Sequence, residues 1–220
     1  MSIVALLIAL EAASQPVASR YDDCVALIAA DLDLGRLAAQ QWVDEGGGAD
    51  ARHCLAVADL QAGFPKLAAV RLQDIAERKD AGDDLIRARL LSQSAEAWLE
   101  AEDPDRALDA LNAAFELAPE AGELHLTAAR VFTALENWQG VIDAVGAAES
   151  AGFPTAETYV MRGRAHQAFG AFETAAQDVV NALTLDPVNV NALVLRGELQ
   201  QAGVVIDVFY DSPNRQTPNR

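Results

Sequence analysis

Basic residues are scarce in this sequence. Lys and Arg number 16 against 33 Asp and Glu, which gives the 220-residue chain a formal net charge of −17. Because such a chain repels phosphate backbones and anionic lipid headgroups, we expect it to bind neither nucleic acid nor a membrane surface. We expect the acidic side chains to lie on the outer faces of helices, where they keep the protein soluble.

Long apolar runs are also missing. The apolar run at residues 3–10 is far shorter than the roughly 20 residues that span a bilayer as a helix. It matches the core of a secretory signal, with small residues after it for cleavage. We therefore predict a signal peptide over residues 1–19, a periplasmic or secreted protein, and no stable membrane insertion once the signal is removed. The alternatives are an N-terminal helix that docks on the core, and a cytoplasmic location.

Cysteine occurs only twice, at Cys24 and Cys54. An even number of cysteines after a signal-like start favours one disulfide in an oxidising compartment. The alternative is two buried free thiols, because cysteine also serves as a small apolar residue. Two cysteines without further ligands do not form a zinc pattern.

Residue patterns that carry catalysis are missing as well. His53, His125 and His166 have no partner at the spacing of metal ligands. The glycines at 46–48 lack the preceding strand and the following Lys-Ser or Lys-Thr of a phosphate-binding loop. No G-x-S-x-G nucleophile elbow is present. We therefore predict no enzymatic activity, no metal and no cofactor.

Alanine and a regular spacing are what the sequence does contain. Apolar residues make up 51% of the chain, and many of them are alanine, which favours helices that approach closely. Small residues recur at steps of 34, at Ala95, Ala129, Gly163 and Gly197, and the same step separates Ala107, Val141 and Ala175. Gly170 is expected to end one helix in the left-handed conformation, and Pro187 to stop the next. The period predicts an all-α array of helix pairs.

This pattern resembles the tetratricopeptide repeat, a 34-residue helix-turn-helix unit. The clearest unit, residues 156–189, has the family's signature residues at Tyr159, Gly163, Gly170, Phe172, Ala175, Ala182 and Pro187. The resemblance covers roughly residues 49–202 and implies a right-handed superhelical solenoid. Its units lie at about 49–87, 88–121, 122–155 and 156–189, followed by a closing helix at 190–202.

The two ends of the array depart from the pattern. Residues 20–48 are expected to form an N-terminal capping helix pair, and residues 203–220 a tail that either docks on the last groove or is disordered. In the first unit, Asp59 stands where an aromatic residue is expected. The step from Ala68 to Ala107 is 39 rather than 34. We expect residues 78–84 to absorb the difference as a longer loop or an added helical turn.

The resemblance implies that the first helix of each unit lines a concave groove. The groove candidates are Arg89, Ser92, Glu96, Leu126, Arg130, Val160, Arg164 and Gln167. Arg130 and Arg164 hold the same place in adjacent repeats, where two guanidinium groups can grip a partner's carboxylate. The alternative is that each pairs with a glutamate of the protein itself. The Lys- and Asn-rich clamp of carboxylate-binding co-chaperones in this family is absent.

These features predict a protein–protein interaction scaffold that binds a partner peptide or helix in the concave groove. The alternative function is that of a structural or assembly subunit, which docks into a larger complex through its convex face or its C-terminal tail.

Overall fold

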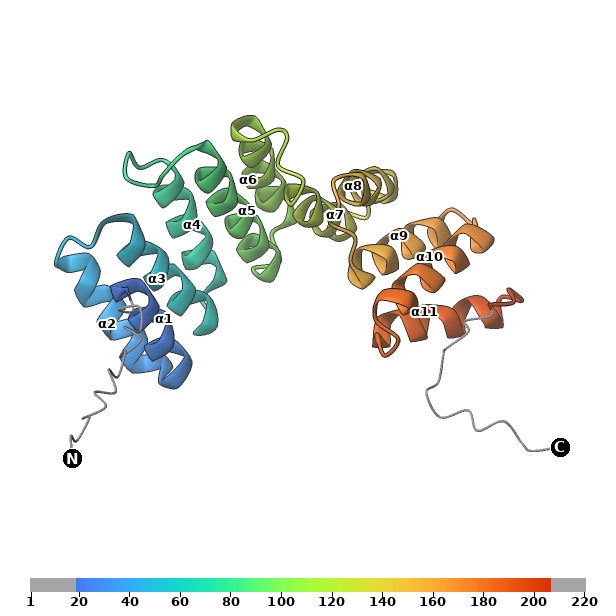
Figure 1. The fold of residues 1–220 in the computed structure, drawn as a ribbon, viewed down its shortest axis with the longest axis horizontal. Helices are drawn as coiled ribbons and strands as arrows, with labels where there is room; N and C mark the ends of the chain where they lie inside the picture. Colours follow the sequence, from blue (N-terminus) through green and yellow to red (C-terminus); the bar gives the residue numbers. More distant parts are fainter. Residues whose placement is uncertain (1–18, 207–220) are drawn as a thin grey trace, which may run out of the picture.

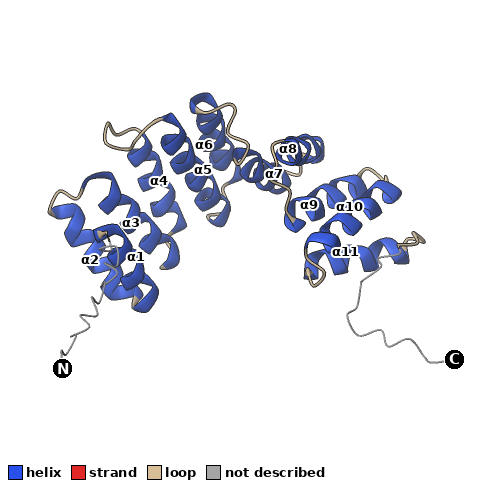
Figure 2. Ribbon diagram, viewed as in Figure 1, coloured by secondary structure: helices blue, strands red, loops and turns tan. Residues whose placement is uncertain are grey.

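The structure, a computed structural model, describes residues 19–206. Within this range every regular element is a helix (Figure 1, Figure 2). The helices are α1 Arg20–Ala30, α2 Leu32–Asp44, α3 Gly48–Gln61, α4 Pro65–Ala76, α5 Asp84–Glu100, α6 Pro104–Leu117, α7 Leu124–Ala134, α8 Trp138–Ser150, α9 Ala156–Ala168, α10 Phe172–Leu185 and α11 Val190–Gln201. The predicted all-α solenoid is confirmed. The predicted signal peptide, apart from Ser19, and residues 207–220 of the predicted tail lie outside the described residues.

The helices pack in sequence order and form two rows. Each helix contacts the next, and in addition α1 contacts α3, α5 contacts α7, α7 contacts α9, and α9 contacts α11. We call the odd-numbered helices the inner row and the even-numbered helices the outer row. The helix pairs follow one another along an arch whose two ends, α1 and α11, lie on the same side (Figure 1).

The helix boundaries repeat with the period of the sequence. The outer helices α6, α8 and α10 begin at Pro104, Trp138 and Phe172, two steps of 34 residues. The turn before each contains one residue with positive φ, namely Glu102 at 57°, Glu136 at 52° and Gly170 at 73°. The predicted left-handed conformation of Gly170 is confirmed, and the two glutamates adopt the same backbone shape at the equivalent places.

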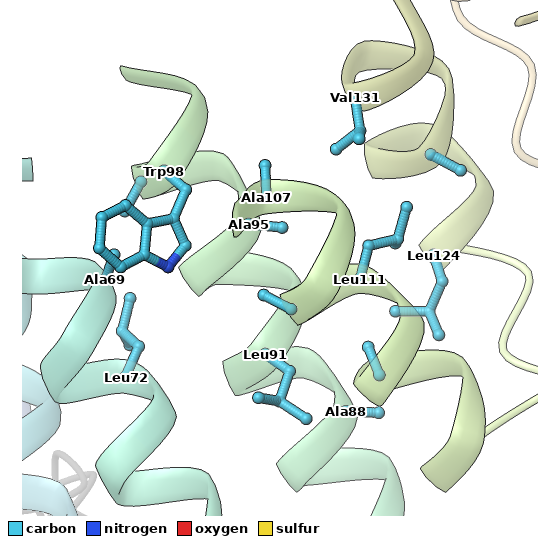
Figure 3. Packing of buried hydrophobic residues seen from close by; sticks show 14 of the residues in the cluster. Ala69, Leu72, Ala88, Leu91, Ala95, Trp98, Ala107, Leu111, Leu124 and Val131 are labelled. Carbon is cyan, nitrogen blue, oxygen red and sulfur yellow. The ribbon is translucent and has the colours of Figure 1, made fainter. Parts of the chain in front are cut away.

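Small side chains bring the two helices of a pair together. Ala95, Ala107, Ala129 and Ala175 have no exposed surface, and Figure 3 shows Ala95 of α5 beside Ala107 of α6. A Cβ atom added to Gly163 of α9 would lie 2.9 Å from Leu195 Cδ2 and 3.3 Å from Asp178 Cβ. Both distances are shorter than ordinary van der Waals contact, so a larger residue at position 163 requires Leu195 of α11 and Asp178 of α10 to shift.

The first repeat absorbs its five extra residues in two ways. A turn-rich connection follows α4 and ends at Asp83, whose side chain caps α5 by accepting from Ile86 N at 2.9 Å. Helix α5 then begins at Asp84, one turn before the expected start of the unit at residue 88. Both predicted alternatives, a longer loop and an added turn, therefore occur together. By contrast, α7 begins only at Leu124, two residues after the expected start of its unit.

Different contacts stabilise the two ends of the helix array within residues 19–206. At the N-terminal end, a disulfide joins Cys24 of α1 to Cys54 of α3, with the Cα atoms 6.5 Å apart, within the range that a disulfide spans. At the C-terminal end, Val204 and Ile206 pack into the apolar cluster of α9, α10 and α11, while Val205 between them is 84% exposed. This alternation is that of an extended segment with one face on the last repeat.

Candidate partner-binding groove

The inner row positions all eight of the groove residues predicted from the sequence. Arg89, Ser92 and Glu96 lie on α5, Leu126 and Arg130 on α7, and the remaining three, Val160, Arg164 and Gln167, on α9. Because these helices pack side by side, side chains one repeat apart come within hydrogen-bond reach. Polar side chains link each neighbouring pair of inner helices from α5 to α11.

The contacts between α5 and α7 satisfy the polar groups of both helices. Arg89 Nε and Nη2 donate to Glu123 Oε1 at 3.0 and 2.9 Å. Ser92 Oγ lies 2.9 Å from Thr127 Oγ1, which donates to Glu96 Oε1 at 2.9 Å. Because Thr127 donates its hydroxyl proton to Glu96, its Oγ1 accepts the hydrogen bond from the Ser92 hydroxyl. A backbone hydrogen bond and then Arg89 hold the pKa of Glu123 below its usual range.

Arg130 sits between glutamates of the two neighbouring inner helices. Its Nε and Nη2 donate to the two oxygens of Glu157 at 3.0 and 2.8 Å, and its Nη1 donates to Glu96 Oε1 at 2.8 Å. These hydrogen bonds raise the pKa of Arg130, and the one to Arg130 lowers the pKa of Glu157. The bidentate pairing with Glu157 is the geometry that guanidinium and carboxylate groups prefer.

Arg164 also has an acidic partner within the protein. Its Nη1 donates to Glu198 of α11 and, at 3.3 Å, to Gln167 Oε1, and Gln167 in turn donates to Glu198 at 3.2 Å. Arg164 lowers the pKa of Glu198. The sequence left open whether Arg130 and Arg164 would be free for a partner or paired internally. In the structure each is paired internally, so a partner carboxylate would have to displace a glutamate.

The two apolar candidates differ in what they offer. Leu126 is half-buried, whereas Val160 is only 8% exposed and packs in the C-terminal apolar cluster. Val160 therefore adds little surface to the groove, contrary to its predicted place there. At the equivalent position of α11, Val194 is 49% exposed, because no further inner helix packs beyond it among the described residues.

The inner face is hollowed at its N-terminal end. A depression of about 440 Å³ is lined by residues of α1, α3 and α5 and of the connection before α5. Its apolar lining includes Ile75, Ile86 and Leu90, and its polar lining includes Tyr21, Asp50, His53, Arg89 and Gln93. Of these, sequence reasoning had selected only Arg89.

A relay of hydrogen bonds crosses this hollow. His53 Nε2 lies 2.7 Å from Gln93 Oε1, and His53 Nδ1 lies 2.7 Å from the Tyr21 hydroxyl. An amide oxygen only accepts, so Nε2 carries a proton, and in the neutral imidazole Nδ1 then accepts from Tyr21. Burial, followed by the charges of Asp50 and Asp22, raises the pKa of Tyr21, so its hydroxyl stays protonated. Asp50, exposed at the rim, makes no hydrogen bond or ion pair with the residues that the structure describes.

The Cys24–Cys54 disulfide joins two of the helices that line this hollow. Cys24 lies one helical turn after Tyr21 on α1, and Cys54 directly follows His53 on α3. Both cysteines are buried, at 8% and 0% exposure. The covalent link therefore fixes the helix that supplies Tyr21 against the helix that supplies His53.

The described residues contain neither a metal-binding cluster nor a helix that could span a membrane. Over residues 19–206, no three His, Cys, Asp or Glu side chains are grouped closely enough to hold a metal ion. In that range no helix combines the length and the apolar character that crossing a membrane requires.

No family model matches the sequence, and no curated protein matches it. Solved structures do show similar folds. MamA residues 41-end from Desulfovibrio magneticus RS-1 has a TM-score of 0.61 at 18% identity, over 70% of this chain and 85% of that one. YrrB, described as a TPR protein, has a TM-score of 0.61 at 16% identity, over 80% and 90% of the two chains. TTC0263, a thermophilic TPR protein in Thermus thermophilus, has a TM-score of 0.58 at 18% identity, over 84% and 100%.

The identities are too low to carry function, but the coverage extends along most of each chain. The agreement therefore concerns the arrangement of helices. Together with the 34-residue repeat of the sequence, it identifies the chain as a protein of the tetratricopeptide-repeat fold.

Proposed function

We propose that this protein is an interaction scaffold that holds an extended or helical segment of a partner protein against its inner face. The repeat fold supports this function because stacked helix pairs present a long surface without needing a catalytic centre. Among proteins of similar fold, YrrB is described as having an unusual peptide-binding site, and another structure is that of the Cut9-Hcn1 hetero-tetramer. Catalysis has no part in the proposal.

The observation that carries the proposal is the hollow between α1, α3 and α5. It joins an apolar lining, including Ile86 at 44% exposure, to a fixed hydrogen-bonded relay and a carboxylate, Asp50, that is unpaired within residues 19–206. Pockets of this kind, mostly apolar with a few oriented polar groups, are typical of binding sites. The segment that fits it has an apolar side chain for the hollow and a cationic group close by for Asp50.

The rest of the inner face serves as a wall. Its arginines already have glutamate partners, so it offers alternating charge with few unsatisfied groups. Exposed pairs of this type contribute little to stability, and a partner can exchange with them at small cost. We therefore place the main anchor in the N-terminal hollow rather than at Arg130 and Arg164.

We further propose that the protein works in an oxidising compartment, with the bacterial periplasm as the first candidate. The Cys24–Cys54 disulfide and the signal-like residues 1–19 support this location. Mass spectrometry of the native protein tests it directly. A mature N-terminus near residue 20 with the two cysteines oxidised is expected, whereas a retained residue 1 with free thiols favours the cytoplasm.

The binding function is tested by capturing partners from native extract with the intact protein and with two matched variants. Ile86→Glu places a charge at the hollow, whereas Leu185→Glu places one on α10, at a side chain that is 51% exposed. We expect Ile86→Glu to lose a specific partner, identified by mass spectrometry, and Leu185→Glu to retain it. Equal retention by both variants contradicts the proposed anchor.

A further double variant separates the hollow from the wall. Replacing Arg130 and Arg164 with Ala removes the ion pairs of the wall with Glu96, Glu157 and Glu198 and leaves the hollow untouched. If the hollow is the main anchor, this variant keeps most of the partner affinity. The binding is assigned to the arginines instead if the double variant loses as much partner affinity as Ile86→Glu and lower salt restores the affinity of neither variant.

A further inference from the structure

The outer row changes character between its second and third helices. The third and sixth residues of α2 are Leu34 and Leu37, and those of α4 are Leu67 and Val70. These four side chains are 55%, 66%, 39% and 42% exposed. The same places carry Arg106 and Asp109 on α6, Gly140 and Asp143 on α8, and Thr174 and Gln177 on α10. At these two places, exposed apolar residues are thus confined to the first two outer helices.

Phe64, in the turn before α4, adds to this surface and is 48% exposed. Helices α2 and α4 both pack on α3, and Arg36 of α2 lies over the ring of Phe64 directly before α4, so the two helices are neighbours at this point. We call Leu34, Leu37, Phe64, Leu67 and Val70 the outer apolar patch. Soluble proteins rarely leave several large apolar side chains exposed together unless they bind something.

Two arginines are held beside this patch by one buried carboxylate. Asp59 of α3 has no exposed surface, and its two oxygens accept from Arg36 Nε and Arg71 Nε, each at 2.7 Å. The Arg36 guanidinium lies 5.0 Å from the centre of the Phe64 ring. Because both arginines use only Nε for Asp59, their Nη1 and Nη2 groups have no hydrogen-bond partner among residues 19–206.

The charge of this region differs from that of the chain as a whole. Arg36 and Arg71 share the Asp59 carboxylate, and Lys66 faces Glu100 and Glu102 in the hollow beside Phe64 and Leu67. Three positive and three negative groups make the region close to neutral, in a chain whose net charge is −17. Helix α4 has more basic than acidic residues, Lys66 and Arg71 against Asp74, whereas α6, α8 and α10 are each net acidic. The side chains of Arg36 and Arg71 are 40% and 28% exposed, so the unused Nη groups can reach a ligand.

We propose that the outer apolar patch, with Arg36 and Arg71, is a second docking surface that binds a short acidic amphipathic segment of a partner protein. Apolar side chains of the segment pack on the leucines of α2 and α4. A carboxylate of the segment accepts from the Nη groups that Asp59 leaves unused. Because Asp59 already fixes both guanidinium groups, little side-chain entropy is lost when the carboxylate binds. This proposal does not depend on the inner groove.

A second copy of the chain fits this surface less well. In a twofold dimer each patch meets its own equivalent, which brings Arg36 and Arg71 of one copy toward those of the other. Two chains with a net charge of −17 also repel each other as they approach. An acidic segment of a different protein avoids the first of these penalties, and at physiological salt the second is screened beyond about 8 Å.

The test uses the full chain and two synthetic amphipathic peptides with identical leucines at i, i+3 and i+4. One peptide carries glutamates beside its apolar face and the other carries lysines. By fluorescence anisotropy, we expect the glutamate peptide to bind at least about tenfold more tightly than the lysine peptide. Its binding should weaken as salt rises from about 50 to 500 mM. Equal binding of the two peptides overturns the proposal.

Single substitutions locate the binding. Leu37→Ser and Leu67→Ser change exposed side chains, so the fold is expected to survive, and each should weaken the glutamate peptide by about tenfold or more. Leu185→Ser, also at an exposed leucine but on α10, should leave affinity unchanged. If all three variants bind equally well, the patch is not the docking surface.

Arg36→Lys tests the arginine without leaving Asp59 unpaired. The ammonium group keeps the charge and one bond to Asp59 but has no Nη pair, so the preference for glutamate over lysine peptide should fall at unchanged melting temperature. An unchanged preference overturns the role of Arg36. Sedimentation velocity of the protein alone provides the last check, since a dimer that Leu37→Ser abolishes makes a second copy the occupant instead.

Discussion

At the scale of single residues, Asp59 shows how one side chain can replace a packing motif. Later repeats carry Trp98, Phe132 and His166 at the equivalent place. In the first repeat a fully buried carboxylate and two arginines from α2 and α4 occupy this space instead. A buried ion pair is weak evidence for stability, because desolvation offsets much of the attraction. Burial does, however, make each of these three side chains depend on the others, because a buried charge without a partner is strongly destabilising.

Removing both cations should therefore be severe. The double variant Arg36→Gln/Arg71→Gln leaves the Asp59 carboxylate without a cationic partner and without exposed surface. We expect it to lower the free energy of unfolding by about 3 to 5 kcal/mol, measured by urea denaturation. Adding Asp59→Leu to the double variant removes the stranded charge and should recover most of the loss. A triple variant no more stable than the double variant would contradict this account.

The left-handed turn residues support a second prediction at this scale. Glu102 and Glu136 are exposed and have φ of 57° and 52°, where the equivalent residue in the next repeat is Gly170. A non-glycine residue in this conformation costs roughly 1 to 2 kcal/mol, partly offset by the lower entropy of its unfolded state. Glu102→Gly and Glu136→Gly should each stabilise the protein by up to about 1 kcal/mol, measured by urea denaturation. The control Glu100→Gly, in the last turn of α5, should destabilise by about the same amount.

At the scale of elements, the helix crossings depend on what faces each small residue. Gly163 of α9 and Gly197 of α11 hold the same place in consecutive units. A Cβ at Gly163 would meet Leu195 and Asp178 within 3.3 Å, whereas a Cβ at Gly197 would meet nothing within 4 Å among the described residues. The two glycines therefore hold the same position within the repeat but differ in how closely other side chains approach them.

This contrast makes a matched pair of substitutions informative. Gly163→Ala should destabilise by about 1 to 3 kcal/mol, because the added methyl group forces α9 away from its neighbours. Gly197→Ala should instead stabilise by up to about 1 kcal/mol, because alanine is the better helix former and the space is open. Thermal unfolding followed by circular dichroism measures both. Equal effects of the two substitutions would falsify the claim that crossing geometry sets the requirement.

The charged contacts between inner helices predict a pH dependence. Arg130 lowers the pKa of Glu157, so this pair stabilises the fold above the usual glutamate pKa of 4.5 and loses its effect as pH falls below it. Asp178 acts in the opposite sense: burial raises its pKa above 3.8, so its ionisation opposes folding as pH rises.

The variant Glu157→Gln tests the direction in which the Arg130–Glu157 contribution to stability changes with pH. Because the Glu157 side chain is 53% exposed, solvent screening keeps the effect to at most about 1 kcal/mol. The variant should be less stable than the parent at pH 7, and the difference should vanish near pH 3. A difference that is the same at both values would assign it to packing rather than charge.

At the scale of the whole molecule, three apolar clusters follow one another along the array. One spans α1 to α3, one runs from α3 to α9, and one joins α9, α10, α11 and the segment ending at Ile206. Stability in such an array is a sum over neighbouring repeats. The N-terminal cluster is the one that contains the disulfide, so it has a covalent link in addition to its packing.

Reduction of Cys24–Cys54 should therefore act mainly on α1. Opening a link between residues 30 apart in sequence should cost about 3 to 4 kcal/mol of unfolding free energy in the chain-entropy model. Hydrogen exchange should show the earliest loss of protection in α1, where Tyr21 forms part of the hollow. The variant Cys24→Ser/Cys54→Ser should not respond to reductant, and protection lost uniformly across the array would argue against a local effect.

The period, the helix pairs and the small residues at their crossings follow from the amino-acid sequence alone. These features depend on helix propensity, apolar spacing and turn residues, which act over a few positions and repeat with the unit. The sequence also shows that Asp59 replaces an expected aromatic residue, but it does not show that Asp59 pairs with Arg36 and Arg71. The tertiary structure decided which of several charges within reach of Arg130 and Arg164 would pair with them. It also brought Tyr21, His53 and Gln93 together across three helices, and left the Nη groups of Arg36 and Arg71 unused within residues 19–206. Such contacts join residues from 12 to 40 positions apart, and they depend on the exact stacking of one pair on the next, which no local pattern encodes.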